Sequence, residues 1–412
     1  MSRHFPSFID AYTDFARDKF CPESFHTWTG LSLIAGMLQR RVSTPKDKIH
    51  FFPNIYVMLV SYPGAGKSTA ISRGVDLLEE LKVELMPNLR IIPQQITEPA
   101  LVDMMRTTEF VNIPGTTIQF PQSAGYFYAD EASSSALQNT CGDFVATLTD
   151  MYDCKRVFRK KLKMDQYTTE ILNPCMNMLC GSTFEYLRTL INDKSSMGGF
   201  ASRIIYVVSH NRDVVETKWG DTLVEDTATK RKLVDDLHDM SKLVGPFRAT
   251  REFTDLYDKW DYEFKQYRVG LNSPRLESML IRKGTNLVKV AMLLSVSEAG
   301  SWKTPGQPEL TGYHFDRAVT LIDDATKDNA FILSQALVAD KTSQAGMTQA
   351  VMRAMKKSGG SATFQSVRSI IFSHGGNIAA YKETIDYMLA ANLLALDGAD
   401  RIKLLVNPDS YL

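Results

Sequence analysis

The sequence predicts an α/β protein built around a parallel β-sheet, and three stretches of the chain predict it. Tyr56 to Ala70 reads YVMLVSYPGAGKSTA, which is an apolar run, a glycine turn and the start of a helix-compatible segment. Gly125 to Ser133 (GYFYADEAS) and Asn173 to Thr183 (NPCMNMLCGST) are two further apolar runs that end in polar residues. Short apolar runs that alternate with helical segments are typical of strands buried on both faces of a parallel sheet.

The composition is that of an ordinary globular protein. The chain has 412 residues, enough for two or three domains, with 44% hydrophobic and 23% charged residues. No apolar run approaches the roughly 20 residues of a membrane span, and the N-terminus lacks the apolar core of a signal peptide. Five cysteines without a CxxC pair favour a reducing compartment. We therefore expect a cytoplasmic protein with no membrane partner.

The charge balance limits where nucleic acid could bind. The chain carries 47 basic and 47 acidic residues, so the field of the whole molecule gives no reason to expect DNA or RNA. Any such binding must come from a local basic element.

Residues 1–48 are predicted to form a helical collar ahead of the sheet domain. Helical apolar spacing predicts two helices between residues 6 and 40, broken near Cys21-Pro22. The sheet domain itself is expected to cover residues 49–215.

The first apolar stretch leads into a phosphate-binding loop, because a glycine turn that opens a helix can surround phosphate oxygens with backbone N–H groups. Lys67 would reach the β- and γ-phosphates of ATP, and the Ser68 hydroxyl would bind Mg²⁺. The full pattern has glycine where this chain has Ser61, but Gly64 and Gly66 remain to supply permissive backbone. The predicted nucleotide-binding residues of the loop are Pro63, Gly64, Ala65, Gly66, Lys67, Ser68 and Thr69.

The second and third stretches end in candidate catalytic residues. Asp130 would hold the hydrated Mg²⁺, and Glu131 would orient and deprotonate the attacking water. The alternative is a strand end that merely meets solvent. At the end of the third stretch, Ser182 or, preferably, Thr183 could hydrogen-bond the γ-phosphate or the water; alternatively a hydroxyl caps the helix that begins at Phe184.

A basic segment lies between the second and third stretches. Six basic residues fall between Lys155 and Lys163, interleaved with apolar ones, and a polar turn near residues 164–166 predicts a β-hairpin. This hairpin is either a solvated ribbon or a sequence-independent grip on nucleic-acid phosphates. The candidate nucleic-acid-binding residues are Arg159, Lys160, Lys161 and Lys163.

Two further arginines are candidates for contacts with the nucleotide. Gly198 to Ser209 (GGFASRIIYVVS) predicts a glycine-hinged turn and a strand with Arg203 at its base. Arg203 could reach the γ-phosphate of a neighbouring subunit as an arginine finger, or form an ion pair at the strand start. Residues 216–338 are expected to form a helical lid over the nucleotide, with Arg282 either contacting the nucleotide or lying on a solvated helix face.

The C-terminal segment, residues 339–412, predicts three helices and a two-stranded hairpin. This pattern describes a winged helix, which often binds DNA and often only mediates protein contacts. Lys382 and Arg401 are its candidate phosphate contacts.

Taken in order, the motifs SYPGAGKST, YFYADEAS, the basic hairpin, NPCMNMLCGST, GGFASRIIYV and LIRKGTNLVKVAMLL resemble those of phage and mobile-element primase-helicase-like AAA+ ATPases. They are also similar to those of the minichromosome-maintenance and superfamily 3 replicative helicases. The resemblance covers residues 25 to 300 and implies a P-loop AAA+ core, a sensor 1 role for Thr183, a sensor 2 role for Arg282, an arginine finger at Arg203 and a channel position for the hairpin. No primase motif is present.

The resemblance implies a ring-forming, hexameric, ATP-dependent DNA helicase or translocase that serves phage or mobile-element replication in a bacterial cytoplasm. Its partners would be single-stranded or forked DNA and replication proteins. The alternative is a helicase loader or replication initiator that does not unwind DNA and binds it through the winged helix. A small-molecule kinase would leave the basic hairpin and the Asp130-Glu131 pair unexplained.

Overall fold

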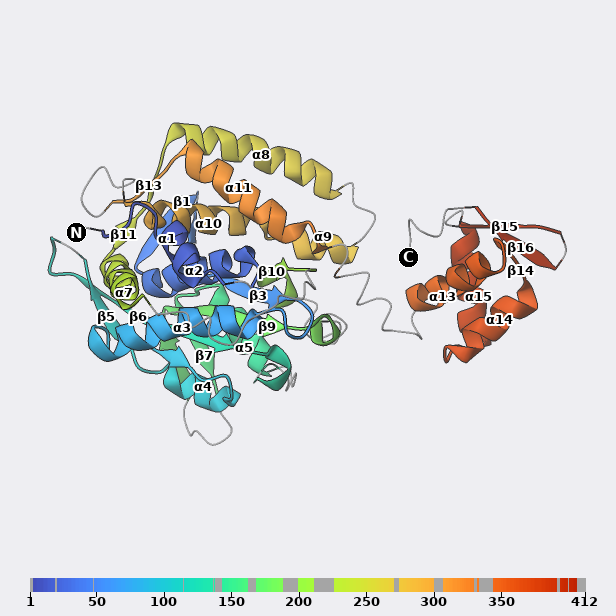
Figure 1. The fold of residues 1–412 in the computed structure, drawn as a ribbon, viewed down its shortest axis with the longest axis horizontal. Helices are drawn as coiled ribbons and strands as arrows, with labels where there is room; N and C mark the ends of the chain where they lie inside the picture. The colour runs from blue at the N-terminus through green and yellow to red at the C-terminus, as the bar shows by residue number, and fades with distance from the viewer. Residues whose placement is uncertain are drawn as a thin grey trace. The chain divides into compact units, whose positions relative to one another are not determined.

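The computed structural model of the chain describes residues 3–18, 21–46, 48–113, 115–135, 137, 143–161, 168–187, 199–210, 226–269, 274–299, 307–329, 332, 344–390, 393–398 and 400–405. The chain forms two compact units, Met1–Asn329 and Ala330–Leu412 (Figure 1). The predicted collar, the predicted sheet domain and the predicted lid up to Asn329 fall in the first unit and contribute to one hydrophobic core. The predicted winged helix falls in the second unit.

The first unit is built on a mostly parallel sheet, as the sequence predicts. Its parallel strands follow the order β10-β3-β9-β6-β4, and β5 pairs antiparallel with β6. The strands are β3 (Tyr56–Val60), β4 (Ile91–Ile92), β5 (Glu109–Asn112), β6 (Gln119–Ala129), β9 (Pro174–Ser182) and β10 (Ile204–Val208). The three apolar stretches of the sequence are therefore β3, β6 and β9, and they are adjacent in the sheet.

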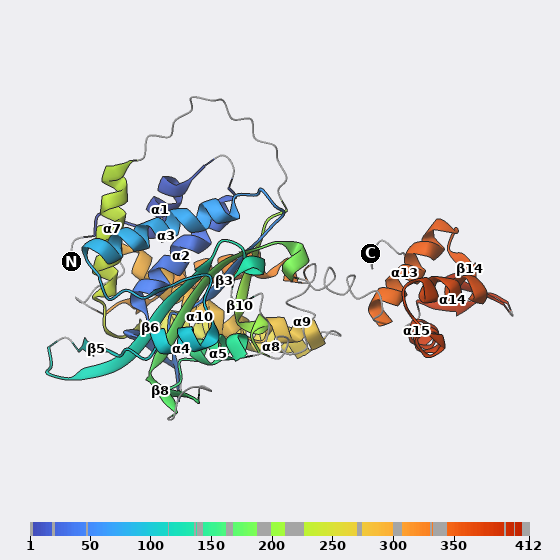
Figure 2. The same ribbon diagram turned by 90° about the horizontal axis from the view of Figure 1, so that it is seen from below.

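Helices cover both faces of this sheet. Figure 2 shows α2 (Glu23–Leu38) and α3 (Lys67–Glu84) on one face, with α4 (Glu98–Met104) and α5 (Asp143–Tyr152) on the other. In β3, Val57 and Leu59 join the core that includes α2 and α3, whereas the Tyr56 hydroxyl donates to the carbonyl of Leu148 in α5 at 2.6 Å. Because both faces are covered, every residue of β3 is buried.

The two N-terminal helices lie where the sequence predicts them, and α2 packs into the core of the first unit. After the short α1 (Phe8–Ala16), α2 is buried on nearly every side and packs against α3, α7 and the sheet. Its sequence is apolar around the whole helix, which suits a core position. Gly36 lets it approach the sheet, since a Cβ there would lie 2.7 Å from the Tyr126 ring.

The region predicted as a lid is also part of this core. Its helices are α7 (Thr227–Ser241), α8 (Arg251–Val269), α9 (Pro274–Leu280), α10 (Lys283–Ser297) and α11 (Gly312–Thr326). The helix α10 is buried along most of its length and packs against α2 and α11, because its apolar residues surround it rather than form a stripe. Two small sheets complete this region, made by β1 (Val42–Lys46), β2 (Ile49–Phe51) and β11 (Gly245–Pro246), and by β12 (Arg248–Ala249) and β13 (Glu309–Leu310).

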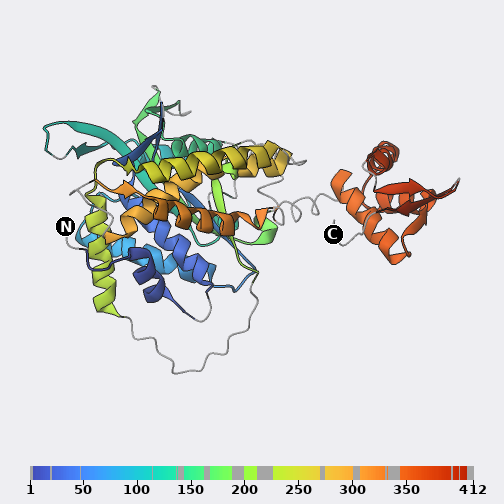
Figure 3. The ribbon, with the colours of Figure 1, turned by 90° about the horizontal axis from the view of Figure 1, so that it is seen from above.

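Two antiparallel hairpins extend from the central sheet. The ribbon of β5 and the start of β6 projects past the sheet and is the teal hairpin at the left of Figure 3. The predicted basic hairpin is present as β7 (Val157–Lys160) and β8 (Thr169–Leu172), although its turn lies outside the described residues. Among the described helices, none is long and apolar enough to span a membrane.

The second unit has its own core of three helices and a small sheet. Its elements are α13 (Gln344–Lys357), β14 (Ser361–Thr363), α14 (Phe364–Ser373), α15 (Ile378–Ala390), β15 (Leu394–Leu396) and β16 (Arg401–Leu404). The strands pair antiparallel in the order β14-β16-β15, so the sheet contains one strand more than the hairpin that the sequence predicts. Val351, Ile371, Met388 and Ile402 are among its buried apolar residues.

Candidate nucleotide-binding site

The loop between β3 and α3 has a backbone geometry compatible with phosphate binding. Gly64 and Gly66 have φ values of 81° and 77°, in the left-handed region that glycine adopts without strain. Ser68 and Thr69 are exposed in the first turn of α3, which contains no acidic residue. The first backbone N–H groups of an 18-residue helix therefore face outward at a site that favours an anion.

Lys67 lies within this loop with its ammonium pointing back at the loop itself. Its Nζ donates to the carbonyls of Ser61 at 3.2 Å and Tyr62 at 2.9 Å, and the residue is only 6% exposed. Burial lowers the pKa of Lys67, while the charge of Glu131 acts in the opposite direction. The ammonium is thus held at the centre of the loop, close enough to Glu131 to sense its charge.

Ser61 occupies the place of the usual glycine without strain, because its φ is not in the left-handed region. Its backbone N–H donates to the carbonyl of Ser182 at 3.2 Å, and its Oγ donates to the carbonyl of Ser209 at 2.7 Å. Ser61 is fully buried. Its two hydrogen bonds therefore join the carboxyl ends of β3, β9 and β10.

Asp130 and Glu131 follow β6 directly, at the same edge of the sheet. The Asp130 N–H donates to Gln94 Oε1 at 3.3 Å, and Glu131 Oε1 accepts from the Ser133 hydroxyl at 3.2 Å. Asp130 Oδ1 is buried and has no hydrogen-bond partner among the described residues, and burial raises the pKa of this carboxyl. A buried carboxylate oxygen without a donor is suited to bind a cation.

The backbone of Asp130 is packed tightly against β9. A Cβ added at Gly181 would lie 2.3 Å from the Asp130 carbonyl oxygen, closer than real Cβ atoms approach. Glycine at position 181 therefore allows the acidic pair to take its place beside β9.

Thr183 follows β9, next to the start of the phosphate loop. Its Oγ1 accepts from the N–H of Tyr186 at 3.3 Å, which is the capping role that the sequence left open as an alternative. The neighbouring Ser182 hydroxyl donates to the Thr183 carbonyl at 3.1 Å. The Thr183 hydroxyl keeps its own proton for another acceptor, so the cap and a contact with phosphate or water are compatible.

A magnesium ion fits these residues. Among the described residues, no group of three or more His, Cys, Asp or Glu side chains could hold a metal ion by itself. Mg²⁺ does not need such a cage, because it takes one or two protein oxygens and completes its shell with phosphates and water. The exposed Ser68 hydroxyl and the unpartnered Asp130 oxygen supply donors of the right kind.

Sequence reasoning missed two polar side chains at this edge. Gln94 lies just after β4, and His210 lies just after β10, where its Nε2 is 3.0 Å from Asp328 Oδ1. An aromatic row joins His210 to the phosphate loop, because Phe184 packs against both the Tyr62 ring at 5.0 Å and the His210 ring at 5.8 Å. The signal that could have found both is their position directly after a buried strand.

Arg203 lies at the opposite edge of the sheet, since it precedes β10 whereas the phosphate loop follows β3. Its Nε and Nη2 donate to the two carboxylate oxygens of Asp153 at 3.0 and 2.5 Å, and Nη1 donates to the carbonyl of Gly199 at 2.6 Å. Its side chain is 8% exposed. The ion pair at the strand start, which the sequence left open, is therefore present in the single chain.

Arg282 lies beside Arg203 and not beside the phosphate loop. Its Nη2 is 3.7 Å from Asp153 Oδ1, and both guanidinium groups lie 5.8 Å from the centre of the Tyr152 ring. The helix α10, which begins directly after Arg282, is packed into the core. Within one chain, Arg282 therefore lies with Arg203 at the edge opposite the loop between β3 and α3.

The candidate nucleic-acid-binding residues of the basic hairpin differ in their surroundings. Arg159 Nε lies 2.6 Å from Glu170 Oε1 on the paired strand, and Lys160 Nζ lies 2.6 Å from Glu98 Oε1. Lys161 is exposed. Lys163 lies outside the described residues.

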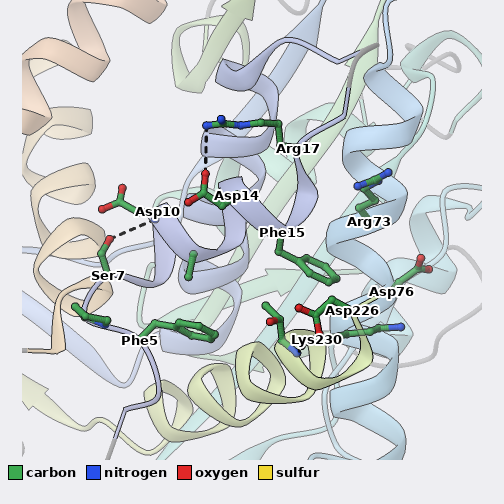
Figure 4. Close-up of a pocket in the computed structure, with 13 residues that line it drawn as sticks. Phe5, Ser7, Asp10, Asp14, Phe15, Arg17, Arg73, Asp76, Asp226 and Lys230 are labelled. Carbon is green, nitrogen blue, oxygen red and sulfur yellow. Dashed lines mark hydrogen bonds and ion pairs between the residues drawn. The ribbon is translucent and has the colours of Figure 1, made fainter. Parts of the chain in front are cut away.

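A pocket of about 910 Å³ lies elsewhere, between α1, α3 and α7 (Figure 4). Its cations are already paired: Arg17 with Asp14, Arg73 with Asp18, and Lys230 with Glu80. The cations of the pocket are therefore mostly neutralised by carboxylates, and the candidate nucleotide-binding site remains at the carboxyl ends of the strands.

No protein-family model matches this chain, and no curated protein sequence matches it either. The case for the site therefore rests on its residues and their geometry.

Proposed function

We propose that this chain is an AAA+ ATP hydrolase that assembles into a ring, a homo-hexamer by the resemblance, and acts as a DNA helicase or translocase. The observation that carries the proposal is the meeting of Lys67, Thr183 and the Asp130-Glu131 pair at one edge of a parallel sheet, at the carboxyl ends of β3, β9 and β6. This edge is where open α/β sheets bind their ligands. A strand placed between the lysine strand and the acidic strand is also the order expected of AAA+ proteins, which is an argument by analogy of fold.

The residues divide the reaction between them. The N–H groups of the glycine loop and Lys67 bind the phosphates and stabilise charge on the transferred group. Mg²⁺, when bound, neutralises charge on the phosphate oxygens. Glu131 accepts a proton from the attacking water and orients it, and the Thr183 hydroxyl donates a hydrogen bond to the water or the γ-phosphate.

Two copies of the chain would complete one site. A five-residue strand, β10, separates Arg203 from the edge that carries the phosphate loop, and a strand of that length spans roughly 16 Å. Arg203 therefore cannot serve the phosphate of its own chain, whereas a neighbour in a ring could present its loop to it. This geometry supports hydrolysis at subunit interfaces.

DNA binding is proposed for both units. In the first, the basic hairpin offers Lys161, with Arg159 and Lys160 available if they exchange their carboxylates for phosphates. The second unit has the element order helix, strand, helix, helix, strand, strand, which is that of a winged helix, and Lys382 and Arg401 are exposed on it.

Strand displacement from a forked duplex tests the proposal. Wild type should unwind in the presence of ATP, Lys67→Ala should bind DNA without unwinding, and Lys82→Ala, at the other end of α3, should behave as wild type. If wild type and Lys67→Ala unwind equally poorly while both bind DNA, the chain is not a helicase.

A mixing experiment tests the shared site. Arg203→Ala should abolish hydrolysis while nucleotide binding is kept, and mixing it with Glu131→Gln should restore part of the activity through hybrid interfaces. A loss of ATP affinity like that of Lys67→Ala would contradict a role across the interface.

A helicase loader or replication initiator is the second candidate. It is favoured by the pairing of Arg159 and Lys160 with carboxylates, which leaves the hairpin less able to grip DNA, and by the winged-helix order of the second unit. Directional translocation would exclude it. Sequence-specific duplex binding that survives deletion of residues 345–412 would exclude the winged helix as its DNA-binding element.

A further inference from the structure

Three cations gather around the Tyr152 ring at the amino-end edge of the central sheet, and two of them share one carboxylate. Arg203 and Arg282 lie 5.8 Å from the centre of the Tyr152 ring, and Lys289 Nζ lies 3.8 Å from it. Asp153 is the carboxylate that pairs with both arginines. Lys289 donates to the carbonyl and the side-chain oxygen of Asn54, and no ion pair joins it to a carboxylate among the described residues. Positive charge is therefore in excess here.

The two arginines share Asp153 unequally. Arg203 holds it with two hydrogen bonds and is 8% exposed, whereas Arg282 approaches a single oxygen at 3.7 Å and is 29% exposed. Asp153 itself is 28% exposed. Asp153 is thus bound tightly by Arg203 and loosely by Arg282.

Arg203 must separate from Asp153 before its side chain can contact a second copy of the chain. If Arg203 left Asp153 with no replacement, a partly buried carboxylate would lose its counter-ion, and unpaired buried charge is strongly destabilising. With Arg282 at 3.7 Å, the carboxylate can stay paired while Arg203 turns outward.

We propose that Arg282 is a positioning residue for Arg203: it takes over Asp153 when Arg203 leaves to bind the phosphate of a nucleotide held by a second copy of the chain. This inference rests on the proposed function. It assigns the two arginines different roles, because Arg203 touches the phosphate and Arg282 acts only through Asp153.

The test is a set of variants assayed for ATP hydrolysis at saturating ATP, with thermal unfolding measured for each. Arg282→Ala should lower the rate by about tenfold, since Asp153 then retains Arg203. Asp153→Asn removes the charge that needs a partner, so Asp153→Asn with Arg282→Ala should hydrolyse within about threefold of Asp153→Asn alone. Asp153→Asn should not rescue Arg203→Ala. The control is Arg268→Ala, which removes an arginine from a comparably loose pair with Glu277 at 3.8 Å and should leave the rate unchanged.

Arg282→Lys keeps the test decisive should Asp153→Asn fail to fold. An ammonium can neutralise Asp153, so this variant should keep at least about a third of the wild-type rate, whereas a bidentate contact of Arg282 with phosphate would not tolerate lysine.

The inference is overturned if Arg282→Ala hydrolyses at the wild-type rate, if its loss is not suppressed by Asp153→Asn, or if Arg282→Lys is as inactive as Arg282→Ala. Those results would leave the proposed ATP hydrolase standing, provided that hydrolysis depends on Lys67. A wild-type chain without Lys67-dependent hydrolysis would overturn both.

Discussion

The substitution Gly181→Ala tests whether the tight packing of Asp130 on β9 matters for chemistry. The new Cβ would lie 2.3 Å from the Asp130 carbonyl oxygen and 3.3 Å from its carbonyl carbon. Both are backbone atoms, so no flexible side chain can move aside. To reach even 3.0 Å, the contact must open by about 0.7 Å, and the backbone of Asp130 and Glu131 must move with it.

The magnitude follows from this displacement. A misplacement of about 1 Å in a catalytic group costs up to about a hundredfold in rate, so we expect hydrolysis to fall by roughly tenfold to a hundredfold. Overpacking should also lower the free energy of unfolding by about 1–3 kcal/mol. Nucleotide binding through Lys67 and the glycine loop should change little, because the atoms nearest to the new Cβ belong to Asp130 and Ile71.

The assay compares hydrolysis, nucleotide binding and thermal unfolding for Gly181→Ala and for Gly30→Ala. Gly30 is the matched control, because its Cβ would meet the ring of Tyr12 at 2.8 Å in the contact between α1 and α2. Gly30→Ala should lose stability without losing hydrolysis per folded molecule. Wild-type hydrolysis by Gly181→Ala, or equal losses in both variants, would refute the idea that Gly181 positions the acidic pair.

Three further predictions concern single side chains. Thr183→Ala should lower the free energy of unfolding by about 1 kcal/mol, because it removes the helix cap, and should slow hydrolysis at unchanged ATP affinity. Thr183→Ser should restore both stability and hydrolysis. Undiminished hydrolysis in Thr183→Ala would show that Thr183 acts as a helix cap and not in hydrolysis. Asp130→Asn should raise Tm at pH 7, because burial raises the pKa of this carboxyl above its ordinary 3.8 and its ionisation therefore opposes folding. The stability that the protonated Asp130 carboxyl contributes is fully present below its ordinary pKa and is lost as pH rises through its raised pKa in the folded state. The Tm values of wild type and Asp130→Asn should therefore converge under acid conditions. Lys161→Ala should flatten the slope of log affinity against log salt concentration for single-stranded DNA by about 0.7. Lys160→Ala should flatten this slope by less, because Glu98 already neutralises Lys160. Equal slopes for both variants and wild type would exclude the hairpin as a DNA contact.

Local chemistry explains what the sequence could predict. The strand, glycine loop and helix around Lys67 were predictable because an apolar run, positive-φ glycines and a helix start are each encoded within a few residues. The acidic pair after β6 and the antiparallel hairpin of β7 and β8 carry equally local signals.

Non-local pairing explains what it could not. No local pattern in the sequence states that β9 lies between β3 and β6, or that Asp153 is the partner of an arginine 50 residues away. The burial of α2 and α10 follows from their apolar residues on every side, a pattern that identifies a core helix but not which elements surround it.

Ser61 combines a local sequence position in the glycine loop with a non-local contact. Gly64 and Gly66 supply the left-handed backbone of the loop, and the hydroxyl of Ser61, which stands where the full motif has glycine, donates to the carbonyl of Ser209 at the carboxyl end of β10. Arg203 stands at the other end of that same strand. A strand paired along its whole length with β3 cannot slide without breaking its ladder, so β10 fixes the distance between the phosphate loop and the root of Arg203. In a ring, each chain would then carry one half of each of two different sites at a set spacing, and the side chains of Arg203 and Arg282 would move while the strand that holds Arg203 stays fixed.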